Sequence, residues 1–152
     1  MKKFILSILI LSGICSYAQN SNTSIGIRGG YHSGISVKHF IESNKAIEGI
    51  ISFRRGGAIV TALYQVQHDF DARGFSWHYG AGAHIGLWNQ VYKKEEEDNL
   101  HLTLGADLIA GLEYEFNEIP FEAALDVLIS MNAVGGGYFS GIGPAVSLRY
   151  CF

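Results

Sequence analysis

A serine and a histidine two residues apart are the side chains of this sequence that come nearest to an enzymatic pair. Ser76 and His78 fall on one face of a predicted strand. Carboxylates on other strands leave open a Ser–His–acid arrangement, as in a lipid-modifying acyltransferase or deacylase. No nucleophile-elbow motif surrounds Ser76, however. Serine and histidine are also common in the wet interiors of β-barrels, so the sequence favours a protein that is not an enzyme.

Paired carboxylates and histidines give no stronger site. Glu113 and Glu115 lie about 7 Å apart on one strand face, which would allow acid–base work, but ion pairing with arginine is the favoured interpretation. His78 and His84 share a face, and six residues of strand separate them by about 20 Å, too far for one metal ion. No cysteine pair has zinc-site spacing. We therefore expect no metal and no cofactor.

The elements that carry these residues are predicted to be strands, because the dominant period of the sequence is two. In "FSWHYGAGAHIGLW" and "LHLTLGADLIAGLEYEF", large apolar residues alternate with polar residues and glycine, and only Trp88 and Ile109 break the pattern. Turn signals divide the chain into eight strands, at 24–31, 35–41, 47–54, 58–68, 75–88, 100–116, 119–131 and 141–152. The sequence predicts an all-β, antiparallel, up-and-down barrel.

The polar face of these strands carries charges of both signs. The ten positions are Arg28, Lys38, Glu48, Arg54, Asp107, Glu113, Glu115, Glu122, Asp126 and Arg149. If this face is internal, its charges must be paired or hydrated. An eight-stranded barrel has just enough interior for its own side chains. We expect a hydrogen-bonded ion network that fills the lumen, with a narrow conduction path as the alternative.

Three features favour a barrel that spans a membrane with its apolar face outward. Glycines gather on the polar face, where a narrow lumen needs small residues. The later strands are long enough for a tilted span of about 9–11 residues, and aromatics fall near their ends. Closure of the last strand on the first leaves no unpaired edge, which lipid requires. A soluble, lipocalin-like carrier with its apolar face inward is the alternative.

The N-terminal residues predict export. "MKKFILSILILSGICSYAQ" has a basic start, a short apolar run and a small-x-small site, so we expect a signal peptide at 1–18 and an outer-membrane barrel domain at 19–152. Lipidation at Cys15 is disfavoured because Ile14, and not a small residue, precedes it. Without Lys2 and Lys3, nine Lys and Arg remain against fourteen Asp and Glu, which makes nucleic acid an unexpected partner.

The sequence "LRYCF" ends on an aromatic residue in mid-alternation. Tyr150 and Phe152 would lie at the periplasmic rim of a closed barrel. A terminal phenylalanine preceded by alternate apolar residues resembles the signal that outer-membrane barrels present to their assembly machinery. The simpler alternative is an aromatic anchor at the membrane interface, and the two interpretations are compatible.

Three segments resemble a family. "GIRGGYHSGISVKHF", "WHYGAGAHIGLW" and "GLEYEFNEIPFEAALD" are similar to segments of small outer-membrane β-barrel proteins of Gram-negative bacteria whose function is not characterised; "YEFNEIPF" is the most specific. The resemblance implies the barrel and its location and brings no catalytic residues. We therefore expect a monomer in outer-membrane lipid with a structural or surface-interaction role, whose external loops, Asn89 to Asn99 and "NAVGGGYFSG", meet a ligand or partner that the sequence does not identify.

Overall fold

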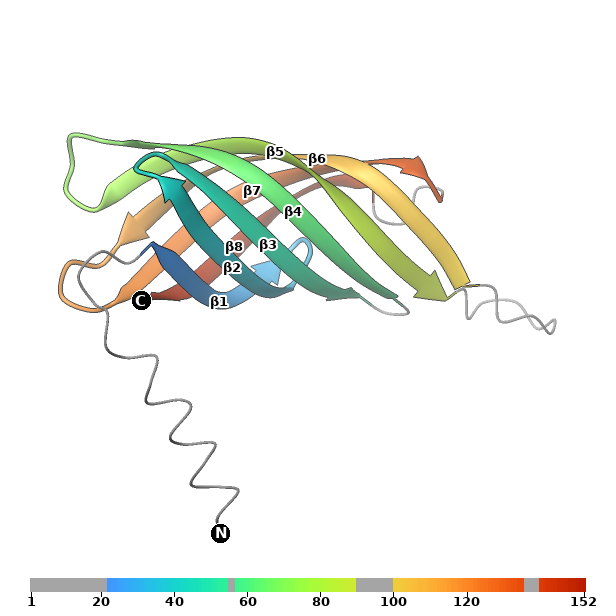
Figure 1. The fold of residues 1–152 in the computed structure, drawn as a ribbon. Coiled ribbons are helices and arrows are strands. Elements are labelled where there is room, and N and C mark those ends of the chain that lie inside the picture. The colour runs from blue at the N-terminus through green and yellow to red at the C-terminus, as the bar shows by residue number, and fades with distance from the viewer. Residues whose placement is uncertain (1–21, 55–56, 90–99, 136–139) are drawn as a thin grey trace, which may run out of the picture.

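The chain forms a closed barrel of eight antiparallel strands, each paired with its neighbours in chain order (Figure 1). The structure is a computed structural model that describes residues 22–54, 57–89, 100–135 and 140–152. The strands are β1 (Thr23–Gly30), β2 (Gly34–Glu42), β3 (Lys45–Arg54), β4 (Gly57–Asp69), β5 (Phe75–Asn89), β6 (Leu100–Glu115), β7 (Phe121–Val134) and β8 (Gly141–Cys151). No helix within the described ranges has the length and apolar character to cross a bilayer. The predicted eight-stranded antiparallel barrel is confirmed.

The last strand closes the barrel on the first. β1 and β8 pair from Ser24 opposite Cys151 to Gly30 opposite Ala145. The backbone amide of Phe152 donates to the carbonyl of Thr23 at 3.0 Å, so the ladder continues to the final residue. Both described termini therefore lie at one end of the barrel (Figure 1), together with the β2–β3, β4–β5 and β6–β7 turns. We call this the terminal end, and the opposite end the far end.

The alternation of the strands divides their side chains between two environments. Large apolar side chains point outward and remain exposed on all eight strands, with Leu125 at 54% and Val146 at 59% as examples. Most of the buried side chains of the described residues are polar or charged. The barrel therefore has the reverse of the usual distribution, with its apolar surface outside.

The predicted strand limits differ from the observed ones where a turn has chemistry of its own. β7 begins at Phe121 and not at residue 119, because Pro120 has no amide hydrogen for the ladder and lies in the turn. The amide of Phe121 instead donates to the carbonyl of Ile119, and that of Phe116 to the carbonyl of Phe121. β7 also runs three residues further than predicted, to Val134.

Parts of the sequence-based prediction lie outside the described residues. These parts are the signal peptide at 1–18, residues 90–99 of the predicted external loop between β5 and β6, and residues 136–139 of the glycine-rich loop.

Candidate functional site: the charged lumen

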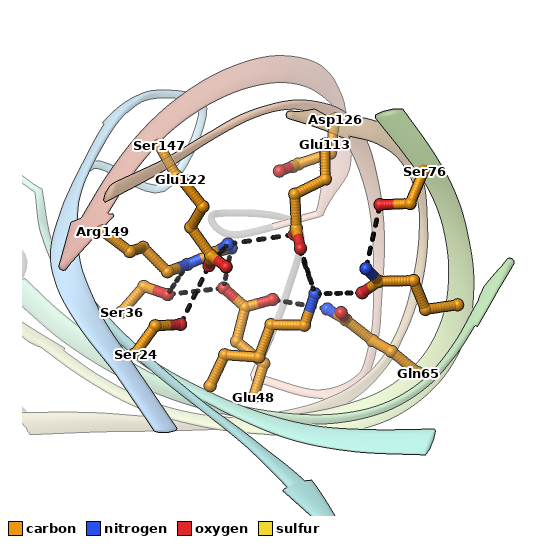
Figure 2. A network of polar contacts seen from close by, with 12 residues as sticks. Ser24, Ser36, Glu48, Gln65, Ser76, Glu113, Glu122, Asp126, Ser147 and Arg149 are labelled. Atoms are coloured by element: carbon orange, nitrogen blue, oxygen red, sulfur yellow. Dashed lines mark hydrogen bonds and ion pairs between the residues drawn. The ribbon is translucent and has the colours of Figure 1, made fainter. Parts of the chain in front are cut away.

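Arg149 is the centre of an ion network inside the barrel (Figure 2). It extends from β8 into the lumen with 1% of its surface exposed. Its Nη1 lies 2.7 Å from Glu122 Oε1 and 3.2 Å from Glu113 Oε2, and its Nη2 lies 2.8 Å from Glu48 Oε1. Its Nε donates to the hydroxyl of Ser36 at 2.9 Å. One guanidinium thus joins carboxylates from β3, β6 and β7, and each of its three nitrogens donates to at least one acceptor.

Lys38 extends this network along the terminal end. Its Nζ lies 2.7 and 3.0 Å from the two carboxylate oxygens of Glu113 and donates to Gln67 Oε1 at 2.7 Å. The amide nitrogen of Gln67 in turn donates to the hydroxyl of Ser76 at 2.9 Å. A continuous chain of polar contacts therefore runs from Arg149 to β5, as the dashed lines of Figure 2 show.

Arg28 and Asp126 form a separate buried pair. Arg28 Nη1 donates to Asp126 Oδ2 at 2.9 Å, and its Nη2 contacts Oδ1, so the pair is bidentate. Both side chains are fully buried. Arg28 Nη1 also donates to the hydroxyl of Ser147 at 3.3 Å. This pair ties β1 to β7 across β8, near the point where the barrel closes.

A second polar cluster, the His84 cluster, lies further toward the far end. His84 Nδ1 lies 2.7 Å from Asp107 Oδ2, and its Nε2 lies 2.9 Å from Asn132 Oδ1. The hydroxyl of Ser130 donates to the other oxygen of Asp107. These four residues come from β5, β6 and β7, so the cluster joins three adjacent strands through their inward faces.

An apolar layer lies between the two polar regions. It consists of Ile50, Leu63, Ile109 and Leu128, all buried in one cluster. On β7, Leu128 is the inward residue between Asp126 and Ser130, and on β3, Ile50 follows Glu48. Side chains thus fill the middle of the lumen, as expected for eight strands. The apolar layer also explains why Ile109 breaks the alternation of its strand.

Eight of the ten predicted lumen charges are buried and paired. They are Arg28, Lys38, Glu48, Asp107, Glu113, Glu122, Asp126 and Arg149. Glu115 differs from the prediction: as the last residue of β6 it is exposed at the mouth of the terminal end, where it lines a polar hollow with Glu42 and Asp69. The side chain of Arg54 is outside the described structure.

The structure brings Ser76 and His78 into the lumen without joining them. The hydroxyl of Ser76 is bound by Gln67, and neither ring nitrogen of His78 has a hydrogen-bond partner among the described residues. Within the same ranges, no group of three or more His, Cys, Asp or Glu side chains has metal-site geometry. The geometry therefore does not assemble the proposed Ser–His–acid arrangement.

The two predicted assembly residues face outward at the terminal end. The rings of Tyr150 and Phe152 stack with centroids 6.2 Å apart, and Tyr150 also contacts Phe121 edge to face at 5.4 Å. Whether assembly machinery reads them stays a prediction.

The alternation of the strands does not identify the neutral partners of the buried polar groups. These are Ser24, Ser36, Gln65, Gln67, Ser130 and Asn132, which bind the buried charges. The sequence gives one indication of them: along each strand they fall on the same inward-facing positions as the charged residues. Serine adds a donor with a small side chain, so it supplies hydrogen bonds to Glu48, Glu122 and Asp107 in a narrow lumen.

Substitution of Gly105 should disturb the His84 cluster. A Cβ at Gly105 would lie 2.4 Å from Cε1 of the His84 ring and 2.3 Å from the carbonyl oxygen of Met131, so both contacts must be relieved by a shift. We expect Gly105→Ala to lower the free energy of unfolding by about 1–3 kcal/mol, the usual cost of overpacking. Urea unfolding of the refolded barrel measures it. Gly49→Ala is the control, since nothing lies within 4 Å of a Cβ there; equal effects would contradict the steric account.

Comparisons with known proteins give a likeness of fold. No family model matches the chain, and no curated protein matches it. The crystal structure of the N-terminal β-barrel domain of Pseudomonas aeruginosa OprF is similar, with a TM-score of 0.69 over 88% of this chain and 100% of that one. The two sequences are 15% identical, so the likeness concerns the fold. It confirms the eight-stranded barrel that the sequence predicted.

Proposed function

We propose that this protein is an integral outer-membrane barrel with a sealed lumen, non-catalytic, which acts through its external loops. The observation that carries the proposal is the reversed polarity of the barrel. An exposed apolar surface that extends around all eight strands is far larger than the patches soluble monomers tolerate. In lipid the same surface is favourable, and the closed ladder satisfies the backbone.

The aromatic residues at the terminal end support this placement. Phe75 packs against Tyr114 with centroids 4.6 Å apart, and Tyr114 packs against Phe116 at 4.9 Å. Together with Phe121 and Tyr150 they form an outward cluster over β5 to β8. Aromatic girdles of this kind belong at the membrane–water interface. The β-barrel domain of OprF has a similar fold, which supports the closed barrel on which this proposal depends.

The contents of the lumen argue against the alternative functions. A lipocalin-like carrier needs an apolar cavity, whereas here paired charges and an apolar layer occupy the interior. A conduction path would have to cross that layer, which offers ions no polar group. A lipid-modifying enzyme needs an activated nucleophile, and the Ser76 hydroxyl is bound by Gln67. We interpret the lumen as the structural core of the barrel. We propose that the loops of the far end bind the ligand or partner. The protein is then a monomer that the assembly machinery inserts into the membrane.

Membrane fractionation with a heat-modifiability gel tests the proposal. We expect the mature chain in the outer-membrane fraction, and we expect the unboiled protein to migrate faster than the boiled one, because a closed barrel resists detergent until heated. A water-soluble lipocalin, run boiled and unboiled on the same gel, serves as the control for the change in migration. A chain released without detergent, with no shift on boiling, would contradict membrane insertion and favour the carrier.

A further inference from the structure

The outward surface of the barrel has an apolar hollow near its terminal end. Its volume is about 490 Å³, and its lining is almost wholly apolar. Phe70, Trp77, Tyr79 and Leu112 form the walls, and the small Ala110 lies at the floor. The four wall residues are between 38% and 50% exposed. The hollow therefore opens toward whatever surrounds the barrel.

The hollow lies where β6 has the small outward side chain of Ala110. Ala110 is directly opposite Tyr79 on β5, and Leu112 is directly opposite Trp77. The Trp77–Leu112 pair places two large side chains beside each other, whereas the Tyr79–Ala110 pair leaves the space above a single methyl group empty; the next outward pair, Ala81 and Leu108, also has one small member. Aromatic rings border that space on two sides, so its shape suits a flexible hydrocarbon chain.

The turn that contributes Phe70 to the hollow also carries charges of both signs. Phe70 belongs to the turn between β4 and β5, whose exposed residues include Asp71 and Arg73. The turn is held by its backbone: the amide of Phe70 donates to the carbonyl of Phe75 at 2.9 Å. Next to it, the ring of His68 stacks on Trp77 with centroids 4.8 Å apart. A fixed turn thus offers a cation and an anion beside an apolar groove.

We propose that this hollow binds one phospholipid with a zwitterionic headgroup, an inference that rests on the proposed membrane location. An acyl chain occupies the groove over Ala110 between Trp77, Tyr79 and Leu112. The phosphate contacts Arg73, and a primary ammonium contacts Asp71. The charges of the turn and the headgroup are complementary, because phosphoethanolamine has an anionic phosphate for Arg73 and a cationic ammonium for Asp71.

Photocrosslinking tests the site on the full mature barrel in vesicles. The probe is a phosphatidylethanolamine with a diazirine on one acyl chain, and labelled peptides are mapped by mass spectrometry. We expect labelling concentrated on Trp77, Tyr79 and Leu112. Ala110→Phe fills the groove and should reduce it at least fivefold, whereas Ala62→Phe, at another exposed alanine of the outer face, should leave it unchanged.

The headgroup is tested separately. Arg73→Gln and Asp71→Asn lie in an exposed turn and should not affect folding, and each should lower labelling by the ethanolamine probe severalfold. Matched probes with phosphocholine or phosphoglycerol headgroups should label the wild type less. If Ala110→Phe fails to fold, these two variants still decide the question.

Each adverse result has a separate meaning. Even labelling around an inserted, heat-modifiable barrel would overturn the lipid site and leave the membrane location intact. Labelling that spares the hollow and falls on the rest of the outer face, with a dimer of the chain in the same vesicles, would overturn it in favour of a second copy as the occupant. A chain that neither enters vesicles nor shifts on boiling would overturn the proposed function itself.

Discussion

Arg149→Leu is expected to lower the free energy of unfolding by about 3–5 kcal/mol, the range for breaking a buried ion pair from one side. The substitution removes the cation that Glu48, Glu113 and Glu122 share within 3.2 Å. Lys38 remains for one of the three, so two buried carboxylates lose their charge partner. Urea unfolding of the barrel in vesicles, monitored by tryptophan fluorescence, measures the change.

Two control variants show whether the loss of stability in Arg149→Leu comes from the lost charge, from the lost donor geometry, or from the loss of any ion pair. Arg149→Lys keeps the positive charge but loses the fork of donors, so we expect an intermediate loss. Lys45→Leu breaks the exposed pair with Glu42, whose side chains are 36% and 58% exposed. Surface pairs contribute about 0–1 kcal/mol, so this variant should be nearly as stable as the wild type. An unchanged midpoint for Arg149→Leu would mean that the lumen carboxylates do not depend on Arg149.

The contacts of Arg149 also show which features of the lumen can be predicted from the sequence and which cannot. Alternation alone predicted that Arg149 and Glu48 face inward, because a period of two assigns every residue of a strand to one side. It did not predict that they meet. They lie on β8 and β3, which are not neighbours, and their contact depends on how the closed barrel brings opposite walls together. No pattern along one strand contains that information.

The errors of the sequence-based prediction have the same origin. Glu115 has the inward parity of Glu113, yet it is exposed, because β6 ends there and the barrel wall no longer covers it. Parity is a local property, whereas burial depends on distance from the mouth of the barrel. The same holds for the apolar layer: alternation marks Ile109 only as an exception on its strand, because the side chains that it contacts lie on other strands.

Asp126→Leu is expected to be as destabilising as Arg149→Leu, with a loss of about 3–5 kcal/mol, because it leaves the guanidinium of Arg28 buried without its carboxylate. Of the described residues, Ser147 would still accept a hydrogen bond from Arg28, at 3.3 Å, but a neutral hydroxyl does not balance a buried charge. The same urea unfolding assay measures the loss.

The double variant Arg28→Met with Asp126→Leu should recover most of that stability. Replacing both members of a buried pair by apolar side chains of similar volume is often neutral or even stabilising by about 1–4 kcal/mol. A double-mutant cycle measures the coupling. A double variant as unstable as Asp126→Leu would mean that Arg28 has a role beyond this pair. No single second substitution should rescue Arg149→Leu, since its charge is shared among three carboxylates on three strands, and this contrast separates an isolated pair from a network.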